Sequence, residues 1–146
     1  MPGSTGSGTN APKWGPVGAQ SDGMIHLDTC FLIRALVPGT DADRRLREWL
    51  SEGRQLGMVS IAWTEFLCGP LEPGERVLAE RIVSERVDYN EFDAQQAADF
   101  FNASGRRRGT LFDCMIAAAA SRRGAALATL NSQDFQRFEA LGLRMV

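Results

Sequence analysis

The stretch MIHLDTCFLIRALV, residues 24–37, changes from a strand pattern to a helix pattern without an intervening loop. Residues 24–28 (MIHLD) have the pattern of a short strand, and residues 29–37 continue as an apolar helix with Thr29 as the expected N-cap. The Pro-Gly pair at 38–39 ends this helix. A strand that passes directly into a helix indicates an α/β domain built on a parallel sheet.

The same alternation continues to the end of the chain. Because short strands alternate with helices, we predict an α/β fold: a three-layer α/β/α domain whose central, mainly parallel sheet has about four to five short strands. In such folds the ligand crevice lies beyond the carboxyl ends of the strands. Further strands are expected at 55–61, within 87–92, at 125–130 and at 143–146. Further helices are expected at 41–53, 61–68 (capped by Ser60), 74–86 (with Val77, Leu78 and Ile82 inward), 93–105, 110–123 and 134–141.

Composition bounds the class of protein. The 146 residues, 44% of them hydrophobic and 23% charged, suit one globular domain. The formal net charge of −2 gives no general attraction to nucleic acid, so such a contact needs a local basic patch. Residues 1–23, rich in Gly, Ser and Pro, are expected to form a flexible tail before a folded domain of residues 24–146. No apolar run approaches the roughly 20 residues needed to span a bilayer.

Cysteine and histidine usage excludes several kinds of site. Cys30, Cys68 and Cys114 are odd in number, lack CxxC spacing and stand beside apolar residues, so we expect reduced core thiols in a cytosolic protein. His26 is the only histidine. A histidine-rich metal site and a Ser-His or Cys-His hydrolase are therefore disfavoured, and His26 is expected to be a packed residue.

Acidic residues recur where the predicted strands end. Asp28 closes the first strand, Glu65 lies about one turn into the helix after the second, and Asp113 lies in the first turn of helix 110–123. Asn131 and Asp134 follow strand 125–130. Carboxylates brought within about 4–6 Å repel one another unless a proton or a cation neutralises them. An all-oxygen cluster selects Mg²⁺ or Mn²⁺, which can hold a phosphodiester oxygen and activate a water.

Each acid also has a purely structural explanation. Asp113 is three residues after Thr110, the spacing of a capping box, and Asp134 stands at the same spacing from Asn131. Asp28 can simply end a strand. These explanations stay open for each acid taken singly, but they do not account for acids at successive points around one expected crevice.

Four segments together resemble a known family: I-H-L-D-T at 25–29, S-I-A-W-T-E-F at 60–66, L-F-D-C-M-I-A-A at 111–118 and L-A-T-L-N-S-Q-D-F at 127–135. Each is weak alone, but their order and spacing are fairly specific. They resemble the PIN domain, and most closely the VapC-type toxins of bacterial toxin–antitoxin pairs, over residues 24–146.

This resemblance implies a PIN-like fold and a Mg²⁺-dependent endoribonuclease, with Mn²⁺ as a possible substitute, that hydrolyses RNA by metal-activated water. It also implies a cognate antitoxin as partner and a homodimer. Asp28 and Asp113 match the family's primary metal ligands, and Glu65 matches a supporting acid. Asn131 stands at the position of the family's fourth acid, and Asp134 is expected to compensate. Whether one or two metal ions bind stays open.

Other residues complete the expected site. Thr129 matches a family hydroxyl position and is expected to orient the site or the substrate. Arg106, Arg107 and Arg108 directly precede the Asp113 helix and can hold RNA phosphates. Alternatively, they belong to a solvated loop or contact an acidic partner segment. The pair at 122–123 is expected to serve only as favourable charge at a helix C-terminus.

Two other functions remain as alternatives. The first is a catalytically inactive PIN-fold interaction module, because Asn131 replaces an acid. The second is a phosphatase of the haloacid dehalogenase type, which is disfavoured because Cys30 stands where that family needs a second Asp. Whether the PIN domain is active or inactive, the apolar helix at 29–37 can offer a groove to an antitoxin helix or a second copy.

Overall fold

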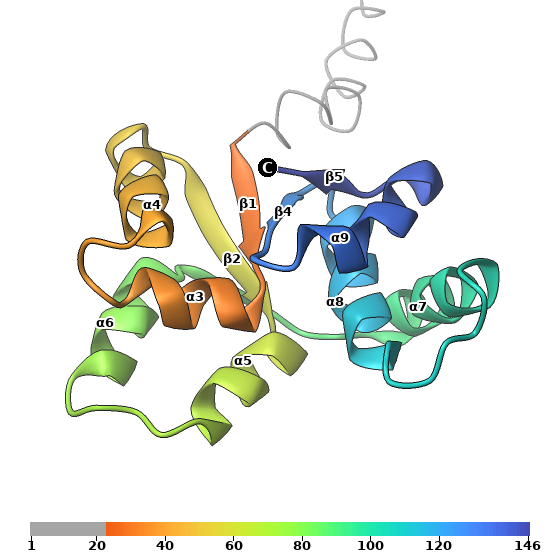
Figure 1. Cartoon of the computed structure of the whole chain (residues 1–146), viewed down its shortest axis with the longest axis horizontal. Helices are drawn as coiled ribbons and strands as arrows, with labels where there is room; N and C mark the ends of the chain where they lie inside the picture. The colour runs from red at the N-terminus through yellow and green to blue at the C-terminus, as the bar shows by residue number, and fades with distance from the viewer. Residues whose placement is uncertain (1–22) are drawn as a thin grey trace, which may run out of the picture.

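The structure, a computed structural model, describes residues 23–146 (Figure 1). The expected flexible tail, apart from Gly23, therefore lies outside the described residues. A five-stranded sheet has the order β3-β2-β1-β4-β5, and all neighbouring strands are parallel, which confirms the predicted α/β fold. The strands are β1 (Met24–Leu27), β2 (Gln55–Val59), β3 (Glu85–Val87), β4 (Ala126–Ala128) and β5 (Arg144–Met145).

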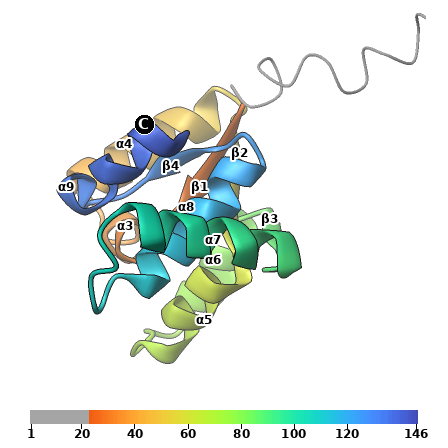
Figure 2. The ribbon, with the colours of Figure 1, turned by 90° about the vertical axis from the view of Figure 1, so that its right-hand side faces the viewer.

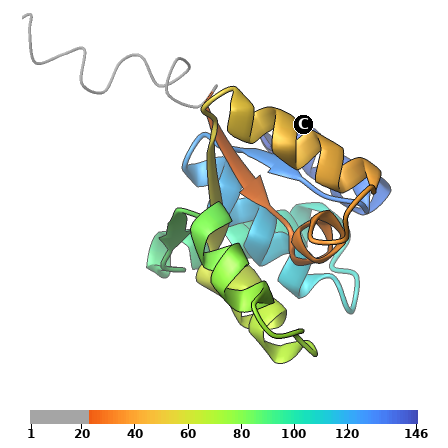
Figure 3. The same ribbon diagram turned by 90° about the vertical axis from the view of Figure 1, so that its left-hand side faces the viewer.

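Helices cover both faces of this sheet. Figure 1 shows α4 on one side of β1 and β2, and α7 and α8 on the other. Seen from the right-hand side, α7 lies across α8 (Figure 2), and the opposite view shows α4 and α6 (Figure 3). The helices are α3 (Thr29–Ala35), α4 (Asp41–Ser51), α5 (Ser60–Cys68), α6 (Glu75–Ile82), α7 (Glu91–Ala103), α8 (Leu111–Arg122), α9 (Ser132–Phe135) and the 3₁₀ helix η2 (Gln136–Leu141).

The order of the strands places a crevice next to β1. The chain adds β2 and β3 on one side of β1, then crosses back to add β4 and β5 on the other. The direction of winding thus reverses between β1 and β4, and ligands of open α/β sheets bind beyond the carboxyl ends of strands at such a reversal. In the described part of the chain, no helix has the length and apolarity to cross a membrane.

Small residues let α8 pack closely against its neighbours. Ala117–Ala120 have no exposed surface, so the helix backbone approaches both the sheet and α7. On the same face, the rings of Phe100 and Phe138 stack at 5.2 Å. On the opposite face, Phe31 of α3 stacks on Trp49 of α4 at 5.5 Å. These aromatic pairs anchor the two helical layers to the sheet.

Two predicted helix caps are wrong. Asp28, and not Thr29, is the N-cap of α3, because its carboxylate accepts the Thr29 N–H. Ser60 is the first residue of α5 rather than its cap, and its hydroxyl accepts a 3.2 Å hydrogen bond from the Tyr89 N–H. At α3 the preceding residue, Asp28, caps the helix in place of Thr29. At α5 the Ser60 hydroxyl bonds the loop before α7 instead of capping its own helix.

The region before α7 also differs from the prediction. The third strand covers residues 85–87 and not 87–92, so the segment that leads into α7 is a loop. On α6, Val77 and Leu78 were expected to face the core, but they are 53% and 49% exposed. The helix is instead anchored by Ala79, which is completely buried.

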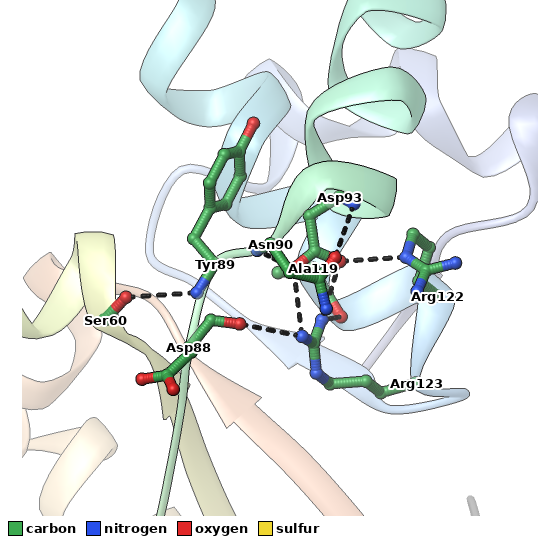
Figure 4. A network of polar contacts seen from close by, with 8 residues as sticks. All are labelled: Ser60, Asp88, Tyr89, Asn90, Asp93, Ala119, Arg122 and Arg123. Carbon is green, nitrogen blue, oxygen red and sulfur yellow. Dashed lines mark hydrogen bonds and ion pairs between the residues drawn. The ribbon is translucent and has the colours of Figure 1, made fainter.

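Asp93 is a buried acid that joins α7 to α8 (Figure 4). It forms a capping box with Asn90, and its two oxygens accept hydrogen bonds of 2.9 Å from Arg122 and Arg123. Arg123 also donates to the Asp88 carbonyl at 3.0 Å. Burial alone would raise the pKa of Asp93, but the hydrogen bonds from Arg123, the Asn90 N–H and Arg122 lower it. The two arginines therefore do more than favour a helix C-terminus, which corrects the expectation from the sequence.

His26 is a packed core residue, as expected. Only 2% of its surface is exposed, and burial, aided by the charge of Arg123, lowers its pKa to about 4. Its neighbour across the sheet is Gly57, where a Cβ would lie 3.1 Å from the His26 ring and 3.0 Å from the Glu85 carbonyl. Glycine at this position therefore makes room for a neutral imidazole in the central strand.

Candidate active site

Asp28 lies at the centre of a polar cluster beyond the end of β1. Its main-chain N–H donates to the Ala128 carbonyl at 2.9 Å, which fixes the residue beside β4. One carboxylate oxygen accepts the Thr29 N–H at 2.8 Å, and the other accepts the Thr129 hydroxyl at 2.8 Å. The Cys30 thiol, 3.3 Å from that second oxygen, completes the contacts. Asp28 as a whole retains only 6% exposure.

Glu65 is tied to the same cluster through Thr29. The Thr29 hydroxyl donates a 2.8 Å hydrogen bond to Glu65, while its N–H bonds Asp28. One threonine thus orients two acids that are 37 positions apart in the sequence. Glu65 lies more than one turn into α5, and this position brings its side chain to Thr29 at the end of β1.

Asp113 belongs to the acidic cluster and not to a capping box. The Thr110 side chain makes no cap hydrogen bond to α8 and instead donates to the Arg107 carbonyl at 2.7 Å. Burial raises the pKa of Asp113 to about 6, and the negative charges of Asp28, Asp134 and Glu65 add to that rise. Four carboxylates from four separate segments therefore act electrostatically on one region.

The residues after β4 reach the cluster in different ways. The Asn131 N–H donates to the Thr129 hydroxyl at 3.0 Å, and its side-chain amide lies 3.6 Å from the Cys30 sulfur. Asp134 is exposed on α9 and acts on Asp113 through its charge. Asn131 makes no side-chain cap bond, so the second proposed capping box is also wrong. Leu130, Asn131 and Asp134, with the two residues between, line an open hollow of about 300 Å³.

The oxygen donors fit a divalent cation by charge and type. Within residues 23–146, no three Asp, Glu, His or Cys side chains are placed to hold one ion together. Asp28 and Glu65 instead accept hydrogen bonds from threonines. Even so, the neighbouring carboxylates that raise the pKa of Asp113 form the hard, anionic donor set that Mg²⁺ and Mn²⁺ prefer.

Arg106–Arg108 lie on the exposed loop that leads into α8, and none has an ion-pair partner within the part of the chain that the structure describes. Arg106 donates to the Asn102 side chain at 2.9 Å. The three arginines thus stand beside the Asp113 turn without bonding the acids.

Three residues near the acids were not predicted to contribute. Thr29 and Cys30 follow Asp28 directly, and the adjacency in L-D-T-C was the available signal. Arg137 is the cation whose charge opposes the rise in the Asp113 pKa. Two of its buried guanidinium nitrogens have no hydrogen-bond partner among the described residues. Nothing in the sequence placed Arg137 there, because η2 packs on α8 only in the folded chain.

The cysteines only partly match the prediction. All three are free thiols, as expected. Cys114 is buried, but Cys30 is half-buried at the acidic cluster and Cys68 is exposed at the end of α5. Burial and the Asp28 carboxylate raise the pKa of the Cys30 thiol.

Comparison with protein families decides the class of this fold. The PIN domain family matches residues 25–141, which include most of β1, all of β2, β3 and β4, and all the acids described above. The chain belongs to the PIN domain family. PIN domains are typically nucleases and generally bind divalent metals. No match was found among curated proteins.

Solved structures of toxin–antitoxin complexes contain chains with a fold similar to that of this PIN domain. The DNA-bound VapBC from Salmonella typhimurium is 26% identical, with a TM-score of 0.66, over 84% of this chain and 96% of that chain. VapBC2 from Rickettsia felis, bound to a promoter DNA fragment, is 18% identical with a TM-score of 0.67, over 84% and 97%. A toxin–antitoxin complex from Klebsiella pneumoniae is 21% identical with a TM-score of 0.62, over 76% and 89%.

Proposed function

We propose that this PIN domain is a Mg²⁺-dependent endoribonuclease that also accepts Mn²⁺ and that hydrolyses RNA phosphodiester bonds. One observation carries the proposal: burial, together with the charges of Asp28, Asp134 and Glu65, raises the pKa of Asp113 to about 6. Such a cluster costs free energy unless a cation neutralises it, and proteins keep costly charge clusters chiefly where they function.

In this proposal each acid has a role. Asp28 and Asp113 are the primary ligands, and Glu65 and Asp134 complete the anionic site. A divalent cation bound there would polarise the scissile phosphate and lower the pKa of the attacking water. Hydrogen bonds from Thr29 and Thr129 already orient two of the carboxylates. Asn131 contributes an amide in place of an acid.

The substrate side of the site is proposed to be basic. Arg106, Arg107 and Arg108 would hold RNA phosphates beside the acids, because Arg pairs well with phosphate oxygens. Thr129 is placed at the carboxyl end of β4, where it can also orient a bound phosphate. Since the net charge is −2, this loop supplies the local attraction that the whole molecule lacks.

We further propose that the protein is the toxin of a type II toxin–antitoxin pair, acting in the cytoplasm and forming a homodimer. The solved VapBC structures support a protein antitoxin as partner. Ile33 of α3 and Val37, two residues after its end, are 48% and 45% exposed and line a hollow of about 250 Å³ with Phe66 of α5. An apolar surface of this kind suits the amphipathic helix of an antitoxin or a second copy.

RNA cleavage by purified variants tests the nuclease. Asp28→Asn and Asp113→Asn are expected to abolish Mg²⁺-dependent cleavage while circular dichroism and thermal unfolding show a folded protein. Asp99→Asn, the same change at an exposed acid of α7, is the matched control and should leave cleavage unchanged. Cleavage at the wild-type rate by Asp113→Asn, in a preparation free of contaminating nuclease, would refute the proposal.

A second candidate is a PIN fold that binds partners without catalysis. Two observations favour it: Asn131 occupies the place of an acid, and no three candidate ligand side chains within residues 23–146 surround one point. Mg²⁺ titration separates the two functions. A true site stabilises the native state by about 2.7 kcal/mol when the ion is at 100 times its Kd, so the melting temperature rises. No shift at millimolar Mg²⁺ would favour the inactive module.

A further inference from the structure

Two large apolar side chains are exposed at the start of α8, immediately before Asp113 of the acidic cluster. Leu111 is 53% exposed and Phe112 is 55% exposed, and with Gly109 they line a hollow of about 150 Å³. The next residue in the chain is Asp113, whose Cα lies about 3.8 Å from that of Phe112 in any trans peptide. Neither side chain joins the hydrophobic core. This exposed pair therefore lies next in sequence to a residue of the site and is open to a ligand.

The loop before this pair is shaped and held by its own hydrogen bonds. Gly105, Arg106 and Gly109 have positive φ angles of 94°, 53° and 82°. The Arg106 N–H donates to the Phe101 carbonyl at 2.9 Å, and the Thr110 hydroxyl donates to the Arg107 carbonyl at 2.7 Å. These bonds hold the loop that leads from α7 into α8 (Figure 1).

The charges of this loop are available to a ligand. The guanidinium groups of Arg107 and Arg108 bond no acceptor within the described residues, and both residues are exposed. Arg107 and Arg108 stand five and four positions before the exposed ring of Phe112. Free arginines and an exposed aromatic ring on one short segment are the combination found in sites for single-stranded nucleic acid. The cations track the phosphates and the ring stacks on a base.

We propose that Phe112, flanked by Leu111, is a stacking platform for one unpaired base of the RNA, while Arg107 and Arg108 hold its phosphates. This inference rests on the proposed ribonuclease function and assigns the base contact within it to one side chain. In a duplex each base face is already covered by its neighbours, so only an unpaired base can lie on Phe112. Because every base has a π-face, the platform tolerates different bases.

A contact between two copies of the chain explains this surface less well. A two-fold interface places the same patch against itself, so a dimer through Phe112 would bring Arg107 and Arg108 close to the same residues of its partner. Like charges brought together in this way repel. The arginines therefore favour an anionic occupant over a second copy.

The test is a comparison of two oligonucleotides by fluorescence anisotropy without divalent cations, so that no cleavage occurs. One is a single strand of about eight uridines and the other is the same strand without bases. We expect Phe112→Ala to weaken binding of the uridine strand roughly tenfold and to leave binding of the abasic strand unchanged. Phe112→Trp should restore binding, whereas Phe112→Leu should not.

Two controls separate stacking from charge and from general exposure. Phe92→Ala removes a ring that is 60% exposed on α7, and it should change neither affinity. Arg107→Gln should weaken the binding of both oligonucleotides. It should also reduce the slope of log affinity against log salt concentration by about one.

Several results would contradict the assignment of Phe112 as a base-stacking residue. One is equal binding of the uridine strand by Phe112→Ala and the wild type, and another is an equal loss on both strands. A third is a change in the oligomeric state of Phe112→Ala by light scattering with RNA affinity unchanged, which would assign the surface to a protein contact. If the wild-type protein cleaves RNA, any of these results would leave the proposed nuclease function intact. Base-dependent binding through Phe112 without cleavage would support the platform and refute only the nuclease.

Discussion

The Thr129 hydroxyl donates a 2.8 Å hydrogen bond to the buried carboxylate of Asp28, across 101 positions of sequence. The bond joins the carboxyl ends of β1 and β4, the two strands between which the winding of the sheet reverses. The same hydroxyl accepts the Asn131 N–H, so it fixes the turn after β4 as well. This part of the site is therefore fixed directly beyond the carboxyl ends of two paired strands.

Replacing Thr129 by Val tests this link. The change keeps the side-chain volume but removes one hydrogen bond to a buried carboxylate and leaves the Asn131 N–H without its acceptor. We expect a loss of about 1.5–3 kcal/mol in the free energy of unfolding, measured by urea denaturation, together with weaker Mg²⁺ binding. Thr129→Ser retains the hydroxyl and should stay near the wild type. Wild-type stability and Mg²⁺ affinity in Thr129→Val would argue against the link.

Asp113→Asn should stabilise the metal-free protein while removing activity. The pKa of Asp113 is raised to about 6, so at pH 7 its charge is unfavourable in the folded state. Because the residue is only half-buried, we expect a gain of roughly 1–2 kcal/mol in urea unfolding at pH 7 without divalent ions. For the wild type the cost is absent below the ordinary value of 3.8 and grows as pH rises through 6. A destabilised Asp113→Asn would show that the carboxylate has a structural role instead.

His26 should make the fold sensitive to mild acid. Burial lowers the pKa of His26 to about 4 from the ordinary 6.5. Between these two pH values the unfolded chain therefore binds a proton at His26 and the folded chain does not. Stability from this group is complete above pH 6.5 and falls as pH drops toward 4, by about 3 kcal/mol in all. In His26→Leu the unfolding free energy should fall less over this range. Parallel profiles for the variant and the wild type would contradict this account.

Asp93→Asn should destabilise the protein without touching the site. It removes the charge that Arg122 and Arg123 share in a fully buried position, and we expect a loss of about 2–4 kcal/mol at pH 7. Because the Asp93 pKa is lowered in the fold, its contribution is present above the ordinary value of 3.8 and fades as pH falls through the folded value. Asp41→Asn, at an exposed pair with Arg44, is the control and should have little effect.

Most of the fold could be predicted because strands and helices alternate clearly in the sequence. The third strand was misplaced because β3 is at the edge of the sheet, where Glu85 and Arg86 are exposed and the apolar pattern is weak. Val77 and Leu78 were expected to be inside because periodicity identifies the apolar side of a helix but not what that side meets.

The acids of the candidate site could be predicted from their positions at strand ends, but their partners could not. The roles of Thr29 and Thr129 depend on which strands become neighbours, and Arg137 reaches Asp113 only because η2 packs beside α8. The pairing of Asp93 with Arg122 and Arg123 was likewise invisible, since 29 and 30 positions separate the partners.

The central claim is that Asp28 and Asp113 serve one cation, and Mn²⁺ binding measured by electron paramagnetic resonance tests it most directly. The wild type should bind Mn²⁺ with competition from Mg²⁺, and Asp28→Asn and Asp113→Asn should each lose most of that affinity. The double variant should be little worse than either single one, because both changes disable the same site. Full Mn²⁺ affinity in either single variant, or losses that simply add in the double variant, would contradict the claim.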